Sequence, residues 1–318
     1  MKKTIKFSKA FLPCAIMSLV IILTGVVGYF VKGINYGLEF KPGLMQQVSI
    51  KSSDGKEISS DEIRNVLTSV KGAEVKETGN GTEGEYSFQI KIESVNTTID
   101  NENKANILRD LYNTYGKENV ILTGTDFIGS QFSSSLIKNV ILLVAGTIIL
   151  IWIYALIRFR WDYACGAIIA LIHDALIIMT FIVWTNMEFT TTTIAAILTI
   201  IGYSINATVV ILDRLRENVH YNAEGKDFIT LLDQSLSETL SRSLITTITT
   251  MFASISLFIF TTGSIHDFAS ALTVGLISGC YSSIYISSGF IAFVYKAKQK
   301  KGIKEPPVKN ISAEQVSI

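Results

Sequence analysis

The chain has 318 residues, of which 48% are hydrophobic and only 17% are charged. Its 28 Lys and Arg nearly balance its 27 Asp and Glu, so the formal net charge is +1. Together with a mean hydropathy of +0.39, this composition is typical of a polytopic membrane protein and predicts no nucleic-acid partner.

The first apolar stretch follows a basic start. Residues 1–9 contain four lysines, and residues 10–31 contain no Asp, Glu, Lys, Arg or His. A helix of this length can cross a hydrocarbon core of about 30 Å. The stretch is too long for the apolar region of a typical signal peptide, and no Ala-x-Ala site precedes Lys32. We therefore expect it to remain as a membrane anchor.

Residues 32–138 form a predicted domain of alternating strands and helices. The pattern predicts strand Leu44–Lys51, helix Ser60–Val70, strands Ala73–Glu77 and Tyr86–Ile92, helix Lys104–Tyr115 and strand Val120–Thr123. The order βαββαβ is that of an α+β, ferredoxin-like domain. The domain has no His, no Cys and no glycine-rich phosphate loop. A binding or mechanical role is therefore favoured over catalysis.

Five further spans are predicted after this domain. They cover residues 139–157, 163–187, 189–212, 243–265 and 268–295, and a basic tail of residues 296–318 follows. Only the span at 163–187 contains ionisable residues, the adjacent His173 and Asp174. The fold class expected is an α-helical polytopic membrane protein of six helices, with the α+β domain inserted between the first and second.

The distribution of Lys and Arg predicts the orientation. These residues gather on the side of both termini, whereas the short loops around Glu188 and Ser264 on the other side contain none. Cytoplasmic loops carry an excess of Lys and Arg, although long translocated domains escape this bias. Both termini should therefore be cytoplasmic, and residues 32–138 should be extracytoplasmic.

Three polar features stand out within the spans. An ionisable residue in a membrane is costly and often marks an ion pathway, so Asp174 is a candidate ion-coupling residue. It could equally be a structural acceptor for neighbouring hydroxyls, or a neutral carboxyl group. Asn206 lies at mid-depth of its span, where an amide needs a partner across a helix interface. The span at 243–265 carries a stripe of hydroxyls, which can serve for packing or line a wet path: Ser243, Thr246, Thr250 and Ser254.

The last span carries a small residue at every fourth position. These residues are Ala271, Gly275, Gly279, Ser283 and Ser287. Small side chains let another helix backbone approach closely. We expect Gly275, Gly279 and Ser283 to be helix-packing positions, and we expect such a seam to serve for docking a partner subunit.

Several motifs resemble one known family. The stretch Ile201–Asn218 resembles the fourth-span motif of the SecF family, the smaller half of the SecD–SecF protein-export complex. Other segments agree: Ala170–Asp174, Ser237–Thr246 and Asp267–Ser283 are similar to the family's third span, the start of its fifth and its last span. Asn35–Gly43 is a weakened form of the motif after the first span. The resemblance covers essentially the whole chain, and the inserted domain is its least specific part.

The resemblance implies an architecture like half of an RND-type transporter, in the inner or plasma membrane of a bacterium. It implies SecD as a partner, association with the SecYEG channel, and YajC and YidC as further candidate partners. It also implies preproteins as substrates and the proton-motive force, or a sodium gradient, as the energy source. No enzyme activity, catalytic residue, cofactor or metal is expected.

One departure from the family pattern bears on ion coupling. Ala207 replaces the aspartate that the family carries in its fourth span, and this aspartate is the one associated with coupling. Arg242 matches the family arginine at the start of the fifth span, but its usual acidic counterpart is absent. Coupling could run through the partner, or through Asp174 with Asn206 and hydroxyls as neutral ligands, or be lost.

The sequence therefore predicts an auxiliary subunit of the Sec translocase. Two alternatives stay open, a small-molecule exporter of the RND type and an uncoupled scaffold subunit of the translocon. The exporter would require a larger exported region than residues 32–138 provide.

Overall fold

The computed structural model describes residues 4–52, 58–70, 72–80, 84–93, 97–128, 130–221 and 225–301. Residues 1–3 of the predicted amino-terminal segment and residues 302–318 of the predicted basic tail lie outside this range.

Six helices of the described chain are long and apolar enough to cross a membrane, as the sequence predicts. They are α1 (Phe11–Lys32), α4 (Ser130–Arg158), α5 (Trp161–Thr185), α6 (Thr191–His220), α7 (Phe228–Phe260) and a last continuous helix. The last helix consists of α8 (Gly263–Ser282), a π-helical segment η3 (Ser283–Ser287) and α9 (Ser288–Lys300). A short 3-10 helix η1 (Phe7–Lys9) precedes α1.

Most of the helices run past the uncharged stretches that predicted them, and α4, α6 and α7 do so furthest. Polar and charged side chains sustain α6 and α7 beyond the apolar region, and Arg214 of α6 pairs with Glu238 of α7. The turn between α7 and α8 lies at Thr261–Thr262, inside the stretch predicted as one span at residues 243–265. Hydropathy does not mark this turn because it contains no charged residue. The turn instead needs the conformational freedom of Gly263, which follows it and has a positive φ of 64°.

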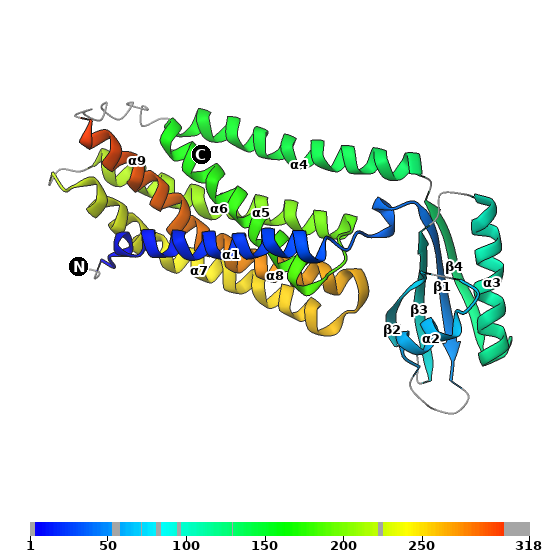
Figure 1. Ribbon diagram of the computed structural model, residues 1–318. Coiled ribbons are helices and arrows are strands. Elements are labelled where there is room, and N and C mark those ends of the chain that lie inside the picture. The colour runs from blue at the N-terminus through cyan, green and yellow to red at the C-terminus, as the bar shows by residue number, and fades with distance from the viewer. Residues whose placement is uncertain are drawn as a thin grey trace.

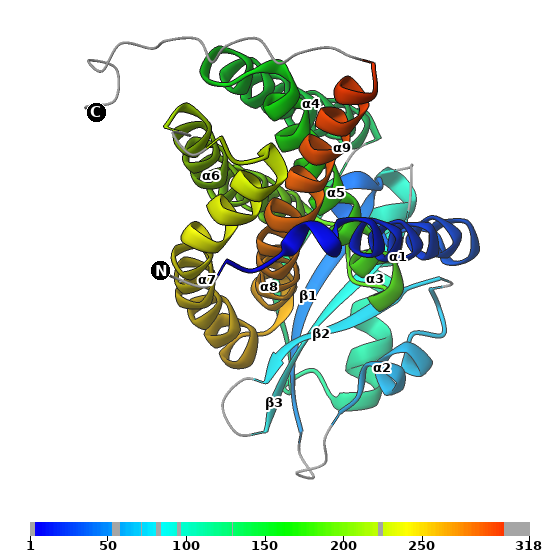
Figure 2. The same cartoon turned by 90° about the vertical axis from the view of Figure 1, so that its left-hand side faces the viewer.

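The helices divide into an inner and an outer set. About half of the apolar window of α5 and α6, and 56% of that of the last helix, is buried. The corresponding fraction is 17% for α1 and α7 and 6% for α4. Seen along the bundle, α8 and α9 lie centrally, with α1 on one side and α6 and α7 on the other (Figure 2). The inner helices α5, α6 and α8 therefore carry the packed core.

The inserted domain is one four-stranded antiparallel sheet with two helices. Its elements are β1 (Gly43–Lys51), α2 (Ser60–Val66), β2 (Glu74–Asn80), β3 (Glu85–Glu93), α3 (Thr97–Tyr115) and β4 (Val120–Ile128). The sheet order is β2-β3-β1-β4. Ser59 caps α2 by accepting a hydrogen bond from the Glu62 amide. The helix is shorter than predicted because Leu67, at its carboxyl end, leaves the helical conformation.

Alternate residues of the strands point to opposite faces of this sheet. Val48, Phe88 and Ile90 pack against α2 and α3 in a continuous apolar core. The opposite face turns toward the helical bundle (Figure 1). The chain enters β1 from α1 through residues 33–42, which include a 3-10 helix η2 (Leu38–Phe40). On leaving, α4 begins two residues after the end of β4.

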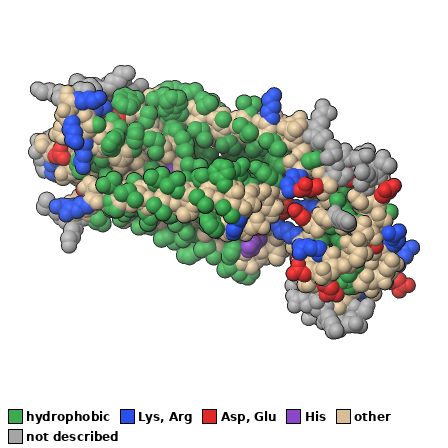
Figure 3. All heavy atoms as spheres, in the orientation of Figure 1, with side chains coloured by type: hydrophobic (Ala, Val, Ile, Leu, Met, Phe, Trp, Pro, Cys, Tyr) green, Lys and Arg blue, Asp and Glu red, His purple; other side chains and the backbone are tan. Residues whose placement is uncertain are grey.

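The surface of the helical bundle differs from that of the inserted domain. A broad hydrophobic surface covers the helical bundle, whereas charged side chains gather on the inserted domain and at the opposite end of the bundle (Figure 3). The start of α1 and the end of α9 both lie at that opposite end (Figure 1).

Candidate functional site

Asp174 lies at the centre of the inner helices and has no exposed surface. Its Oδ2 accepts hydrogen bonds from Ser204 of α6 at 2.6 Å and from Ser282 of α8 at 2.7 Å. Its Oδ1 accepts one from Ser278 of α8 at 2.6 Å and lies 3.1 Å from Nδ1 of His173. The carboxylate therefore joins three helices: three serine hydroxyls donate to it at 2.6–2.7 Å, and Nδ1 of His173 lies 3.1 Å away.

Small residues of the last helix allow α5 and α6 to come close to α8 around Asp174. A Cβ atom added at Gly279 would lie 3.2 Å from the Cβ of Ser204, so the glycine lets this serine come close to α8. A Cβ atom at Gly275 would meet Ile200 of α6 and would lie 3.0 Å from Cδ1 of Ile178 of α5. Gly275 and Gly279 thus allow α8 to contact α5 and α6 beside Asp174.

This packing corrects one expectation for the seam in the last span. Gly275, Gly279 and Ser283 are buried within the chain itself, and Ser283 donates to the carbonyl of Cys280. The seam is therefore occupied by α5 and α6 and does not offer a surface for a partner subunit. Its spacing predicts close helix packing, but it does not reveal whether the neighbouring helix belongs to the same chain.

His173 is the second ionisable residue of this site. It is 6% exposed, and its Nε2 atom has no hydrogen-bond partner in the described part of the chain. Its ring lies 5.9 Å from that of Tyr281, whose hydroxyl donates to the Cys14 carbonyl of α1.

The structure does not bring the other candidate ion-coupling residues to Asp174. Asn206 of α6 and Arg242 of α7 are both exposed in the isolated chain. Ala207, at the position of the family aspartate, is half-buried. The reason is rotation about α6, because Ser204 and Thr208 point into the bundle and Asn206, two residues after Ser204, points away from it.

Two of the residues that hold Asp174 were not singled out from the sequence. Ser278 and Ser282 lie four positions apart on α8, so they share one helix face and can reach the same carboxylate. Their spacing was the available signal. The stripe of small residues in the same helix overlaps this spacing and indicates helix packing, so the sequence alone did not distinguish a serine pair that binds a carboxylate.

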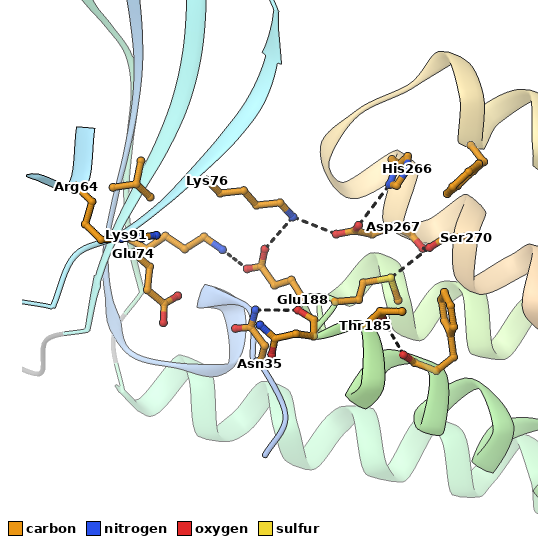
Figure 4. Close-up of a pocket in the computed structure, with 15 residues that line it drawn as sticks. Asn35, Arg64, Glu74, Lys76, Lys91, Thr185, Glu188, His266, Asp267 and Ser270 are labelled. Atoms are coloured by element: carbon orange, nitrogen blue, oxygen red, sulfur yellow. Dashed lines mark hydrogen bonds and ion pairs between the residues drawn. The ribbon is translucent and has the colours of Figure 1, made fainter. Parts of the chain in front are cut away.

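A second polar site lies where the inserted domain meets the bundle. Glu188, in the loop between α5 and α6, forms one ion pair with Lys91 of β3 and a longer one, at 3.5 Å, with Lys76 of β2. Lys76 also pairs with Asp267 of α8 at 3.0 Å. Figure 4 shows both lysines pointing from the sheet toward these two carboxylates. We call these four residues the charged junction.

The charged junction borders a pocket of about 680 Å³ between the sheet and the ends of α5 and α8. The Glu188 and Lys91 side chains are only 10% and 11% exposed, and that of Lys76 is 38% exposed. Burial alone would lower the pKa of the Lys76 ammonium, but Asp267 and Glu188 outweigh it and raise that pKa above its ordinary value. Lys76 therefore stays charged throughout the neutral range, and the junction is an ion-pair network.

Backbone contacts reinforce the charged junction. Thr262, just before α8, donates its hydroxyl to the Thr78 carbonyl of β2 at 3.1 Å. The linker after α1 pairs with the loop before α6, since Gly37 donates to the Phe189 carbonyl and the Phe189 amide donates to Asn35. The domain is thus attached to the bundle at more places than its two covalent connections.

Comparisons with known proteins cover nearly the whole chain. Residues 108–297 match the family described as protein export membrane protein SecD/SecF, C-terminal. The protein translocase subunit SecF of Treponema pallidum is 30% identical over an alignment that covers 94% of this chain and 98% of the relative. The protein translocase subunit SecF of Borreliella burgdorferi is 36% identical, over 93% of this chain and 99% of the relative.

Two solved structures are similar in fold. SecDF from Thermus thermophilus, described as a translocon-associated membrane protein, matches 93% of this chain with a TM-score of 0.79 and 26% identity. SecDF in its super-membrane-facing form matches 96% with a TM-score of 0.67 and 26% identity. The chain spans only 39% and 41% of these two longer chains.

Proposed function

Because the chain belongs to the SecD/SecF family of protein-export membrane proteins, and to its SecF group, we propose that it serves as an accessory subunit of the Sec protein translocase. The observation that carries this proposal is similarity to SecF proteins over more than nine-tenths of both chains. The chain is a multi-pass membrane protein. Its role is to promote preprotein export and not to catalyse a reaction.

SecD is the proposed partner, and the outer surface of α6 and α7 is its proposed docking site. This surface exposes Thr199, Asn206, Thr246 and Thr249 at membrane depth, where lipid offers no hydrogen bonds. The three threonine hydroxyls donate to carbonyls of their own helices. The amide of Asn206 would be satisfied across an interface with a partner helix. Through SecD the chain would associate with SecYEG, YajC and YidC.

The proposed topology places the inserted domain, residues 32–138, outside the cell membrane and both termini in the cytoplasm. In support, Lys and Arg gather at the end of the bundle that holds the start of α1 and the end of α9 (Figure 3). The domain is proposed to be ferredoxin-like, because its βαββαβ order and its β2-β3-β1-β4 sheet match that fold.

For energy coupling, we place this chain's contribution at Asp174. It is a carboxylate inside the spans and lies where three helices meet. Uptake of a proton or a cation there would turn at least one serine hydroxyl from a donor into an acceptor or a ligand, which changes the contact of α8 with α6. The proton-motive force, or a sodium gradient, would thereby change how the helices pack. Each charge that crosses 100 mV supplies about 2.3 kcal/mol.

Export measured in a strain that depends on this chain tests the proposal. Depletion should leave the precursor of a Sec-dependent secreted protein unprocessed in a pulse-chase assay. Loss of resistance to small toxic compounds with normal export would favour the RND-type exporter instead.

Asp174→Asn tests the coupling step in the same strain. It should reduce export and remove the sensitivity of export to an uncoupler, whereas the matched change Asp213→Asn, at an exposed ion pair with Arg158, should change neither. Normal uncoupler-sensitive export with Asp174→Asn would move coupling to the partner. Ala207→Asp, which restores the family carboxylate, should increase uncoupler sensitivity. Indifference to both changes would favour coupling through the partner if export stays sensitive to the uncoupler, and the uncoupled scaffold if it does not.

A further inference from the structure

The inserted domain buries polar side chains that have no partner. Among the described residues, eight buried side-chain atoms lack a hydrogen-bond partner, and five of them belong to Gln46, Asp100 and Thr125. Gln46 has no exposed surface and Asp100 is 4% exposed. Both amide atoms of Gln46, both carboxylate oxygens of Asp100 and the hydroxyl of Thr125 are involved. Buried polar groups in folded proteins are nearly always satisfied, so this concentration requires a cause.

The topology places these three residues at one end of the sheet. Gln46 of β1 pairs directly with Thr125 of β4, so their side chains leave the same face. That face is the one covered by α3, because Val48, two residues after Gln46, packs in the apolar core beneath this helix.

Asp100 belongs to the same end. The last residue of β3, Glu93, pairs with Gly43, which also pairs with Ile128 at the end of β4. Helix α3 begins at Thr97, and Figure 1 shows its start at the end of the sheet where β1 begins. Asp100 lies seven positions before Ile107, a core residue of α3, and therefore on the helix face that packs on the sheet.

The chemistry of this group suits a hard cation. Four of the five atoms, all except the Gln46 amide nitrogen, are carboxylate, amide or hydroxyl oxygens, which are the ligand types that hard cations prefer. An ionised carboxylate buried without a partner is strongly unfavourable. Lys104 follows one turn later on α3, yet in the described part of the chain no side chain donates to Asp100.

We propose that Asp100, Gln46 and Thr125 bind a monovalent hard cation such as Na⁺ between α3 and the β1–β4 end of the sheet. A single positive charge balances the single carboxylate, whereas a divalent ion would leave an excess charge in a buried site. This end of the sheet is the one at which β1 receives the chain from α1 and β4 passes it to α4. The cation would hold α3 to the two strands that connect the domain to the membrane.

Hydrogen exchange of the full-length protein in detergent tests this site. The probe is NaCl, compared at equal ionic strength with choline chloride and with CaCl₂. A ligand at one hundred times its dissociation constant shifts an opening equilibrium by about 100-fold, so Na⁺ should slow exchange in α3 and β4 by up to that factor. No difference between Na⁺ and choline, or a response to Ca²⁺ alone, overturns the proposal.

Asp100→Asn and a matched change in the same helix locate the effect. Asp100→Asn should abolish the Na⁺ response and speed exchange in Na⁺. Asp110→Asn alters a buried carboxylate that accepts hydrogen bonds from the amide and hydroxyl of Ser69, and it should keep the Na⁺ response. If Asp100→Asn slows exchange relative to the parent, the carboxylate is an uncompensated charge and no cation binds. Thr125→Val, which removes one neutral ligand, should raise the Na⁺ midpoint; an unchanged midpoint removes Thr125 from the site and overturns the proposal as stated.

Discussion

Replacing Glu188 with Gln should release the inserted domain from the bundle. The change removes the carboxylate that Lys91 and Lys76 share and leaves the Lys91 side chain, only 11% exposed, without its ion-pair partner. Breaking a buried ion pair in this way costs about 3–5 kcal/mol. Because 1.4 kcal/mol corresponds to a factor of ten, the lower figure predicts a roughly 100-fold larger population of the undocked domain.

A cysteine beneath the charged junction reports that population. Met187 borders the pocket and is 8% exposed, so Met187→Cys should react with a membrane-impermeant maleimide mainly when the domain undocks. The three native cysteines, Cys14, Cys165 and Cys280, would first be replaced. In this background, Glu188→Gln should speed labelling by roughly 100-fold, provided that closing is faster than labelling.

The matched control is Glu93→Gln. Glu93 pairs with Lys41 within the domain, and its side chain is 61% exposed. Exposed ion pairs contribute about 0–1 kcal/mol, so this change should alter the labelling rate by less than about fivefold. If Glu188→Gln labels no faster than Glu93→Gln, the charged junction does not hold the domain, and the inference from burial is refuted.

Two further predictions concern packing and pH. Gly275→Ala should destabilise the bundle by about 1–3 kcal/mol, because the added Cβ would lie 3.0 Å from Ile178 Cδ1 and closer still to α6. This loss should lower the midpoint of unfolding in SDS. Gly202→Ala, where the added Cβ would have no atom within 4 Å, should leave that midpoint nearly unchanged, and equal effects of the two changes would contradict this account. Burial, with the Glu62 carboxylate beside it, raises the pKa of Tyr115 to about 12. Since that pKa is raised on folding, the stabilisation is complete below about pH 10 and is lost between there and about pH 12. The difference in tyrosinate absorbance between the parent and Tyr115→Phe should therefore have its midpoint near 12, and a midpoint near the ordinary value of about 10 would disprove the burial effect.

The sequence predicts the parts of this fold that depend on local pattern. Long uncharged stretches predict the six membrane helices because a helix needs about 20 apolar residues to span a bilayer. Alternation and helical spacing predict the strands and helices between the first and second spans. Asp174 stands out for a related reason, because ionisable groups are rare at membrane depth.

The arrangement of these parts depends on contacts that a single sequence does not contain. Asn206 and Ser204 occupy the same uncharged stretch, and nothing in its composition tells which of them faces the bundle. Glu188 reads as an isolated loop carboxylate, although β2 and β3 supply its partners from about one hundred residues away. The α7–α8 turn at Thr261–Thr262 is missed because uncharged turn residues do not interrupt hydropathy.

The short connection between β4 and α4 has a mechanical consequence. Only residue 129 separates the end of the strand from the start of the helix, and little of α4 is held by the rest of the bundle. A tilt of the sheet would therefore be expected to move α4 as well, and the displacement would grow along the length of the helix. Labels at the far end of α4, near Arg158, would report small rotations of the domain as larger displacements across the membrane.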